Sequence, residues 1–324
     1  MKHHALLIAA LAAIVSALLS LLSGQAWLAD LASHFRLHYV VGITLLLWPA
    51  IALRSRLAAL LLAVALGFHL YALVMFEGET IDARSSTSRN STSQHSTTQG
   101  STAIAHFTLL VTNLKVSNRD YSGVAGKLRE LDADAIIVVE LTPPMQAHLA
   151  TAIDYPYYHG IALPGANGVG IFSRLPFLDR ELPDFNVPAT PALRVVQEIA
   201  GTRVQLVGVH PLAPMTPTMY AARNRQFAGI AQFAREQSGA LVIAGDFNST
   251  PWSNHFRQLL EQSGLDAAHH QYGLKGTWPG CTPLLSIPID HVLTSGEVRV
   301  TSKRVVEIPG SDHCGLLLDL EINH

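Results

Sequence analysis

The segment 1–76 is almost free of charge, and this feature constrains the fold more than any other. Its charged side chains are Lys2, Asp30, Arg36, Arg54 and Arg56. Between these lie three long apolar stretches, at 5–22, 39–53 and 57–76. A helix needs about 20 apolar residues to cross the hydrocarbon layer of a bilayer. We therefore expect three transmembrane helices rather than buried helices of a water-soluble core.

The few basic residues in the short loops predict an orientation. Lys2 precedes the first helix and Arg54 and Arg56 occupy the second loop, so both places belong on the cytoplasmic side. A cleaved signal peptide is the alternative for the first stretch, and the other two stretches would still anchor the chain. We expect a multi-pass protein of the cell (inner) membrane that contacts lipid through residues 5–76. His69 is interpreted as facing a neighbouring helix rather than as an intramembrane site.

Residues 77–103 are expected to form a linker that lies, like everything after it, on the non-cytoplasmic side. Ser and Thr make up most of the part from 85 to 103. Such a segment contains too little apolar surface to offset the entropy lost on ordering. The chain is therefore predicted to comprise an anchor at 1–76, a linker at 77–103 and one further domain at 104–324.

The segment 104–324 is long enough for one buried core. It carries 16 Lys and Arg against 20 Asp and Glu, a net charge of −4, and so lacks the basic surface of a typical DNA-binding protein. Its apolar patterns predict helices at 121–131, 217–237 and 256–263. Strands are predicted at 107–112, 135–141, 168–172, 194–199, 203–209, 240–244, 289–293, 298–306 and 316–320. Because strands outnumber helices, a mixed sheet or a pair of packed sheets is expected.

Acids, amides and histidines recur where these predicted strands end. They are Asn113, Glu140, His210, Asp246, Asn248, Asp290 and the pair Asp312-His313. Functional groups of α/β proteins gather at strand ends and in the loops beyond them. Each residue alone has a structural explanation: Gly-Asp-Phe-Asn at 245–248 favours a turn, and Asn113 could cap the next segment. Their joint occurrence favours one site.

The chemistry of this set suits phosphate esters. Carboxylates of Glu140, Asp246 and Asp312, with amide oxygens, are the ligands that Mg²⁺ prefers. His313 oriented by Asp290 would contact a phosphate or transfer a proton. Phosphoryl transfer needs both a neutralised phosphate and an oriented water.

The order of the motifs resembles the endonuclease/exonuclease/phosphatase superfamily, the fold of DNase I and of exonuclease III-like nucleases. The motifs are Val-Thr-Asn-Leu at 111–114, Val-Val-Glu at 138–140, Val-His-Pro at 209–211, Gly-Asp-Phe-Asn at 245–248, Ile-Asp-His at 289–291 and Ser-Asp-His at 311–313. The continuation after Asn248 and Thr277-Trp278-Pro279 are similar to a bacterial, membrane-anchored branch. The resemblance implies an α/β, four-layer DNase I-like sandwich of two mixed β-sheets flanked by helices, here preceded by three transmembrane helices.

The resemblance also implies roles. Glu140 would be the principal Mg²⁺ ligand (Mn²⁺ is the other metal expected), with Asn113 and Asp312 completing the metal surroundings. The catalytic residues would be His210, Asp246, Asn248, Asp290 and His313. Among these, Asp246 would orient or deprotonate the attacking water, and Asn248, His210 and His313 would contact the phosphate.

Two positions depart from the family pattern. Val139 stands where many members have Gln before the metal-binding Glu. Leu114 and Lys115 follow Asn113 where a second Asn is usual within a few residues, and Asn118 is the nearest candidate for that amide. Neither departure removes a required group, so an active enzyme is expected.

The expected activity is that of a membrane-anchored, Mg²⁺-dependent phosphoesterase, with a nuclease as one option, which hydrolyses a phosphodiester or phosphomonoester. Its partner would be a phosphate-ester substrate (nucleic acid, phospholipid or small phosphodiester), and no protein partner is evident. One alternative is a lipid-headgroup phosphodiesterase of the sphingomyelinase type. The other is a non-catalytic binding module on the same fold.

Four further residues leave alternatives open. Arg223 and Arg225 are interpreted as solvated helix charges, with binding of a substrate phosphate as the alternative. Cys281 and Cys314 would form a disulfide beside the site or remain two buried thiols.

Overall fold

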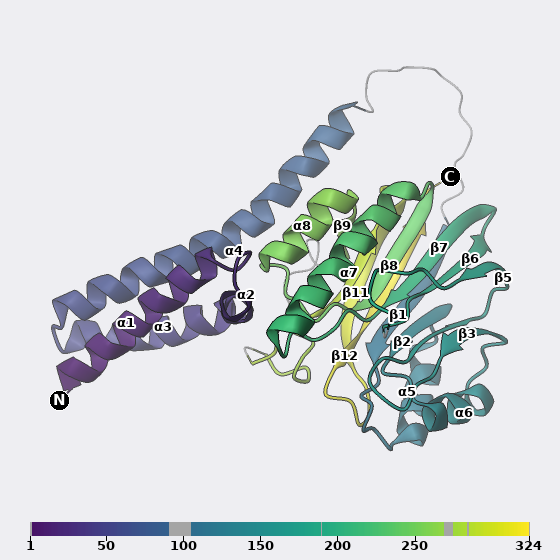
Figure 1. Cartoon of the computed structure of the whole chain (residues 1–324), viewed down its shortest axis with the longest axis horizontal. Helices are drawn as coiled ribbons and strands as arrows, with labels where there is room; N and C mark the ends of the chain where they lie inside the picture. Colours follow the sequence, from purple (N-terminus) through teal and green to yellow (C-terminus); the bar gives the residue numbers. More distant parts are fainter. Residues whose placement is uncertain (1, 91–104, 189, 269–274, 284, 324) are drawn as a thin grey trace. The chain divides into compact units, whose positions relative to one another are not determined.

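The computed structural model describes residues 2–90, 105–188, 190–268, 275–283 and 285–323 (Figure 1). The chain divides into two compact units, residues 1–99 with 251–257 and residues 100–250 with 258–324. The expected linker overlaps the last part of a long helix that ends at Asn90, and the rest of it lies outside the described residues. Its role as a flexible tether stays a prediction.

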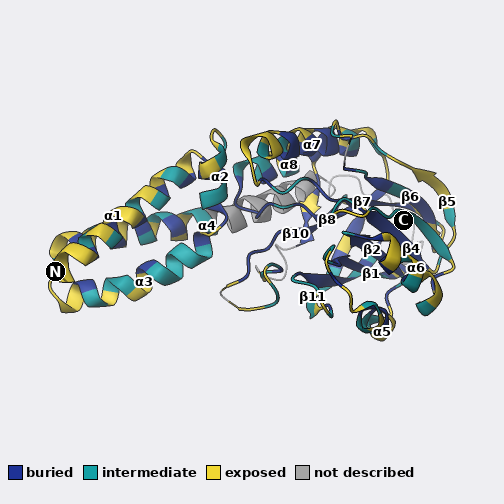
Figure 2. Cartoon of the chain, turned by 60° about the horizontal axis from the view of Figure 1, so that its bottom comes forward, coloured by how far each residue is buried: buried dark blue, intermediate teal, exposed yellow. Residues whose placement is uncertain are grey.

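The N-terminal unit consists of helices, and their bounds are α1 Lys2–Leu21, α2 Trp27–Ser33, α3 Arg36–Ala52 and α4 Arg56–Asn90. Small side chains such as Ala10 and Ala58, with Leu62, form the contacts among α1, α3 and α4. Large apolar side chains such as Trp48 and Leu45 are exposed instead, and exposed positions recur along α1 and α3 (Figure 2). This distribution is typical of helices that pack through small residues and present bulky ones to lipid.

Two described helices are long and apolar enough to cross a membrane, Lys2–Leu21 and Arg56–Leu73. The middle apolar stretch falls in a pair of helices, α2 and α3, bent by 65°, which would supply a third crossing. Three crossings stay a prediction. His69 of α4 is buried and faces α1, where its Nε2 lies 3.1 Å from Ser16 Oγ, as the sequence interpretation expects.

Two six-stranded mixed sheets form the C-terminal unit. The first has the order β11-β12-β1-β2-β4-β3 and the second β5-β6-β7-β8-β10-β9. The strands of the first sheet are β1 Ala105–Asn113, β2 Ala135–Val139, β3 Tyr157–Ile161, β4 Val169–Ser173, β11 Val298–Glu307 and β12 Cys314–Ile322. Those of the second are β5 Phe177–Glu181, β6 Leu193–Ile199, β7 Thr202–Val209, β8 Ala240–Asp246, β9 Asp266–Ala267 and β10 Asp290–Thr294.

The helices of this part of the chain are α5 Tyr121–Leu131, α6 Pro143–Ala152, α7 Pro217–Glu236 and α8 Asn254–Ser263. α5 and α6 lie beside the first sheet, and α7 lies beside the second (Figure 1). The architecture of two mixed sheets flanked by helices confirms the DNase I-like expectation.

Alternate side chains of the central strands build two cores. Leu109, Ile137 and Val242 face into the space between the sheets. Leu110 and Ile136 point to the outer face of the first sheet, against α5 and α6. Because strands such as Ala135–Val139 are covered on both faces, every residue in them is buried, which explains their unbroken apolar sequences.

Local signals fix the flanking helices. Asp120 caps α5 by accepting a hydrogen bond from the Gly123 N–H at 3.0 Å. Thr216 caps α7 in the same way, with Pro217 at its first position. The start of α7 matters for function because the loop before it carries His210.

Candidate active site

Most of the predicted site residues meet where interior strands of the two sheets end. Asn113 ends β1 and is in register with Val139 of the parallel strand β2, so Glu140 follows directly beside it. In the second sheet, Asp246 ends β8 and pairs with Asp290 of the antiparallel strand β10. His210 follows β7, which runs parallel to β8. The strand ends therefore deliver side chains from both sheets to one place.

Asn113 bridges the two sheets. Its buried side-chain amide donates to Glu140 Oε1 at 3.0 Å and to Asp246 Oδ2 at 3.1 Å, and it lies 3.5 Å from His313 Nε2. Its Oδ1 accepts the Lys115 backbone N–H at 2.9 Å. The amide nitrogen thus orients both carboxylates, while the amide oxygen caps the start of the next segment.

The conformation of the Glu140 backbone and a hydrogen bond from the Val116 backbone position the Glu140 side chain, in addition to its contact with Asn113. Its φ is +56°, an uncommon conformation for a non-glycine residue. Its Oε2 accepts the Val116 N–H at 2.6 Å. A residue in this conformation ends the strand and turns its carboxylate toward the site.

Gly245 sets the position of Asp246. Its φ is +153°, and a Cβ there would lie 1.8 Å from the Val209 carbonyl oxygen, so a side chain does not fit. Asp246 is almost completely buried, and its Oδ1 accepts the Asn248 N–H at 2.8 Å. The Gly-Asp-Phe-Asn sequence is therefore a turn and a site segment at once.

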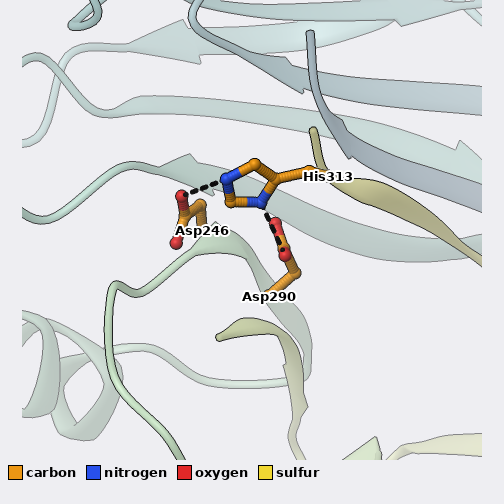
Figure 3. A group of neighbouring side chains, drawn as sticks. All are labelled: Asp246, Asp290 and His313. Atoms are coloured by element: carbon orange, nitrogen blue, oxygen red, sulfur yellow. Dashed lines mark hydrogen bonds and ion pairs between the residues drawn. The ribbon is translucent and has the colours of Figure 1, made fainter. Parts of the chain in front are cut away.

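His313 lies between two carboxylates (Figure 3). Its Nδ1 is 3.0 Å from Asp290 Oδ2, and its Nε2 is 3.7 Å from Asp246 Oδ2. Burial opposes the charged imidazolium, but Asp290 and Asp246 outweigh it and raise the pKa of His313 to about 10. Burial likewise opposes ionisation of Asp246, yet His313 and His210 lower its pKa to about 2.

The same cluster has one unsatisfied atom. Burial raises the pKa of Asp290, against the effect of His313. Among the described residues, no group forms a hydrogen bond with Asp290 Oδ1. His313 Nδ1 and Asp290 Oδ2 therefore form a buried pair in which the other carboxylate oxygen has no described partner.

His210 and Asn248 form the other wall of the site. Asn248 Nδ2 donates to the Pro211 carbonyl oxygen at 3.0 Å and lies 3.3 Å from His210 Nε2. His210 Nε2 also faces Asp246 Oδ2 at 3.6 Å, and its Nδ1 lies 3.0 Å from the Ala166 carbonyl oxygen. Burial opposes protonation of His210, but Asp246 raises its pKa above the ordinary value.

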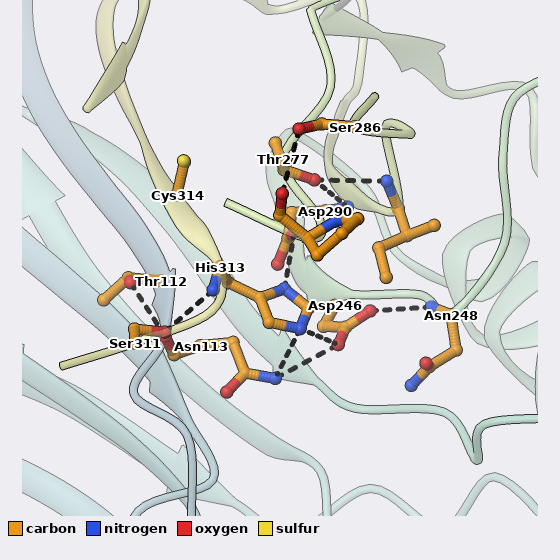
Figure 4. Close-up of polar contacts among 12 residues, drawn as sticks. Thr112, Asn113, Asp246, Asn248, Thr277, Ser286, Asp290, Ser311, His313 and Cys314 are labelled. Carbon is orange, nitrogen blue, oxygen red and sulfur yellow. Dashed lines mark hydrogen bonds and ion pairs between the residues drawn. The ribbon is translucent and has the colours of Figure 1, made fainter. Parts of the chain in front are cut away.

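Two hydroxyl groups, which the sequence motifs include without assigning them a role, hold these residues (Figure 4). Thr277 Oγ1 accepts the backbone N–H of Asp290 at 3.3 Å. Ser311 Oγ donates to the Asn113 carbonyl oxygen at 2.7 Å and accepts the His313 N–H at 3.0 Å. The available sequence signals are the position of Ser311 directly before the Asp-His pair and that of Thr277 in the Thr-Trp-Pro motif at 277–279.

Cys281 and Cys314 form a disulfide, with Cα atoms 5.7 Å apart. The bond joins the loop that carries Thr277 to the residue after His313. The Cys314 N–H also donates to the Thr277 carbonyl oxygen at 2.9 Å. Of the two alternatives, the disulfide is therefore the one the structure contains.

Asp312 stands apart from the network. Its side chain is 40% exposed and pairs with Lys115 Nζ at 3.6 Å. Asn118 supplies no second amide to the site, because its Nδ2 donates to the carbonyl oxygens of Leu114 and Pro309. The site edge near Glu140 and Asp312 is thus more open than the edge near Asp290.

For Arg223, the interpretation as a solvated helix charge is wrong. Its side chain is completely buried, and Nη1 donates to the Asn248 carbonyl oxygen at 3.1 Å. Arg225, two residues on, is exposed as expected. The difference arises because Arg223 lies on the same helix face as the buried Phe227 and Ile230.

Among the described residues, one group has the spacing to hold a divalent metal ion. The ligand atoms of Asp246, Asp290 and His313 lie within 4.8 Å of one another, but they are already paired among themselves. Of the residues predicted to surround Mg²⁺, Glu140 offers carboxylate oxygen atoms beside Asn113, whereas Asp312 is paired with Lys115. The residues present therefore fit a hard divalent cation.

Comparison with known proteins agrees with this arrangement. Residues 110–313 match the model of the Endonuclease/Exonuclease/phosphatase family. No curated protein matches the chain. Among solved structures, TDP2 of D. rerio complexed with a single-strand DNA product is 17% identical, with a TM-score of 0.57 over 66% of this chain and 98% of that one.

Two bacterial structures match about the same share of this chain. An endonuclease/exonuclease/phosphatase family protein from Bacteroides thetaiotaomicron is 16% identical, with a TM-score of 0.56 over 68% of this chain and 97% of that one. Sphingomyelinase C from Streptomyces griseocarneus is 19% identical, with a TM-score of 0.50 over 66% of this chain and 99% of that one. At these identities the likeness shows the fold.

Proposed function

Since the chain belongs to the Endonuclease/Exonuclease/phosphatase family, we propose that it is a membrane-anchored, Mg²⁺-dependent phosphoesterase that hydrolyses a phosphodiester or phosphomonoester by attack of water. The observation that carries the proposal is the convergence of one amide, two carboxylates and one histidine. Asn113, Glu140, Asp246 and His313 are joined by side-chain contacts of 3.0–3.7 Å. Such a constellation provides charge stabilisation and proton transfer in one place.

The site residues of the second sheet, together with His313 just before β12 of the first sheet, bind the phosphate and orient the water. Asp246, ionised by its two histidine neighbours, accepts a hydrogen bond from the water and directs it at phosphorus. His313, protonated and held by Asp290, donates to a phosphate oxygen. Asn248 and His210 contact the phosphate from the other side.

Glu140, Asn113 and Asp312 would hold the metal ion. When bound, a divalent cation neutralises phosphate charge and polarises the bond to the leaving oxygen. Lys115 pairs with Asp312 at 3.6 Å and supplies a positive charge at the same edge. The metal identity expected from oxygen ligands is Mg²⁺, with Mn²⁺ able to substitute.

Both nucleic acids and lipids are reasonable substrates for this fold. The printed names of two similar structures include a DNA product and a sphingomyelinase. The net charge of −4 for residues 104–324 does not favour DNA. A lipid-headgroup phosphodiesterase is the second candidate, because Met215 and Leu285 are 71% and 62% exposed in the loops after His210 and Thr277.

The membrane anchor and the disulfide support a location on the non-cytoplasmic side of the inner membrane. Two or three helices have the length and composition of membrane spans. The disulfide between Cys281 and Cys314 is of a kind that persists in oxidising compartments. The basic loops at Lys2, Arg54 and Arg56 predict the same orientation.

The test uses the full chain in detergent with bis-p-nitrophenyl phosphate, p-nitrophenyl phosphate, plasmid DNA and sphingomyelin in mixed micelles. Each substrate is measured with Mg²⁺, with EDTA, and with the Asp246→Asn variant, whose matched control is Asp179→Asn on the exposed edge strand β5. We expect Mg²⁺-dependent turnover that falls by about 10³-fold in Asp246→Asn alone. No turnover of any substrate by folded protein would favour the non-catalytic binding module instead.

A further inference from the structure

Arg223 is a completely buried arginine on the face of α7 that packs against the second sheet. Burial of a guanidinium group is unfavourable unless its hydrogen bonds are satisfied and its position is well defined. Arg223 is nevertheless buried beside the site, whereas Arg225 on the same helix is exposed to solvent. The contacts of Arg223 explain what it does there.

The guanidinium is fixed in both position and plane. Its Nε and Nη2 atoms donate to Asn224 Oδ1 at 3.2 and 2.9 Å. Its carbon lies 5.4 Å from the ring centroid of Tyr220 and 5.3 Å from that of Phe227. Contacts with two aromatic rings and one amide leave Nη1 aimed at the Asn248 carbonyl oxygen, 3.1 Å away.

Asn248 is the residue that needs such support. Its φ is +50°, which is uncommon for a residue with a side chain. Its N–H is held by Asp246 at 2.8 Å and its carbonyl oxygen by Arg223, so the backbone of Asn248 is fixed on both sides. In this fixed conformation, the Asn248 Nδ2 atom reaches the Pro211 carbonyl oxygen and His210 Nε2.

We infer that Arg223 is a positioning residue for the proposed reaction: it holds the strained Asn248 segment so that the Asn248 amide and His210 contact the substrate phosphate together. The inference rests on the proposed function of this site. A neighbouring side chain of α7 acts in the same direction, because Gln226 Oε1 accepts the Leu212 N–H at 3.0 Å and braces the segment after His210. Helix α7 thus supports both segments that form this wall of the site, the one at Asn248 and the one after His210.

An arginine is required by this geometry, because lysine keeps the charge but lacks the planar fork that stacks between two rings and reaches a carbonyl group. Arg223→Lys is therefore the informative variant, and its expected stability is closer to that of the wild type than that of Arg223→Met. Ile230→Val, a buried change about two turns further along α7, controls for loss of stability. Arg225→Met controls for loss of a positive charge.

The experiment measures kcat and KM of the full chain for bis-p-nitrophenyl phosphate at saturating Mg²⁺, with inorganic phosphate as competitive inhibitor. We expect Arg223→Lys to lower kcat/KM about tenfold and to weaken phosphate inhibition, whereas Ile230→Val and Arg225→Met stay within about twofold of the wild type. In an Asn248→Ala background, Arg223→Lys should cause no further loss, because both changes remove the same contact to the phosphate.

Three results would overturn the inference. They are an unchanged Arg223→Lys enzyme, full additivity with Asn248→Ala, or an equal loss in Ile230→Val at equal Tm. If Arg223→Lys does not fold, the side chain is structural and the inference is also wrong. An inactive wild type would instead contradict the proposed function, so the two failures are distinguishable.

Discussion

The two edges of the site are the group Asp246, Asp290 and His313 and the pair Glu140 and Asp312. They differ in how their charged side chains are neutralised. Asp246, Asp290 and His313 are buried and neutralise one another through contacts of 3.0–3.7 Å. On the other edge, Glu140 accepts only neutral N–H groups among its described hydrogen bonds, and Asp312 is 40% exposed. The first edge is preorganised by the protein itself, whereas the second keeps negative charge that a cation would complement.

On the proposed function, this contrast predicts that the metal ion binds at the edge that carries Glu140. A buried group that is paired with an opposite charge loses that pair when it binds a cation, whereas Glu140 gives up only hydrogen bonds from neutral N–H groups. Substitutions can test the two edges independently. A change at the Glu140 edge should alter the concentration of metal ion that the enzyme needs, and a change at the His313 edge should alter the rate of the chemical step.

The largest effect is expected from removal of the cation or of its main ligand. Addition of EDTA should abolish turnover, and Mg²⁺ should restore it. Glu140→Gln, which keeps the shape but removes the charge, should lower kcat/KM about 10³-fold. Steady-state kinetics of the full chain measures this, with Glu198→Gln on the exposed face of β6 as control. Equal activity with EDTA would contradict the assignment.

A smaller loss, about 10²-fold in kcat, is expected from Asp290→Asn. The amide can still occupy the site but no longer stabilises the His313 imidazolium, from which Asp290 Oδ2 is 3.0 Å away. KM for Mg²⁺ should stay within about twofold of the wild type. A kcat that stays near the wild-type value would show that His313 does not need its partner.

The disulfide should contribute to stability more than to chemistry. It closes a sequence separation of 33 residues, and its removal by Cys281→Ser with Cys314→Ser should lower the free energy of unfolding by about 2–4 kcal/mol. Thermal unfolding of the full chain with and without reductant measures this loss. Reductant should have no effect on the double variant, which serves as the control.

The smallest effect is expected at Lys115. Lys115→Gln frees Asp312 from its ion pair, which is 3.6 Å long and about 40% exposed, and such pairs are weak. The Mg²⁺ concentration for half-maximal activity should therefore fall, by less than about tenfold. Lys127→Gln, on α5, is the matched control. A rise instead would indicate that Lys115 helps to bind substrate.

The central part of the fold could be predicted from the sequence because buried strands have continuous apolar runs. β2 and β8 are predictable for this reason, and the helix at 121–131 is predicted with its observed bounds. The edge strands β3 and β5 are not predicted. Every residue of β3 is half-buried and most of β5 is exposed, so neither strand has a clear alternation of apolar and polar residues.

The sequence predicts those site residues that directly follow a buried strand. Asn113, Glu140 and Asp246 each follow an apolar run, and the structure joins them through one amide. The contact between Arg223 and Asn248 could not be read from either residue alone. Its one signal is spacing, because Arg223 lies one helical turn before Phe227 on the apolar face of the helix.

The most direct test of the whole account is the Mg²⁺ dependence of bis-p-nitrophenyl phosphate hydrolysis in the full chain, compared among wild type, Glu140→Gln and Asp290→Asn. We predict that Glu140→Gln raises the half-saturating Mg²⁺ concentration more than about tenfold, while Asp290→Asn lowers kcat and leaves that concentration unchanged. If Asp290→Asn instead shifted the Mg²⁺ requirement and Glu140→Gln did not, the metal ion would belong to the Asp246, Asp290 and His313 cluster and the account would be wrong.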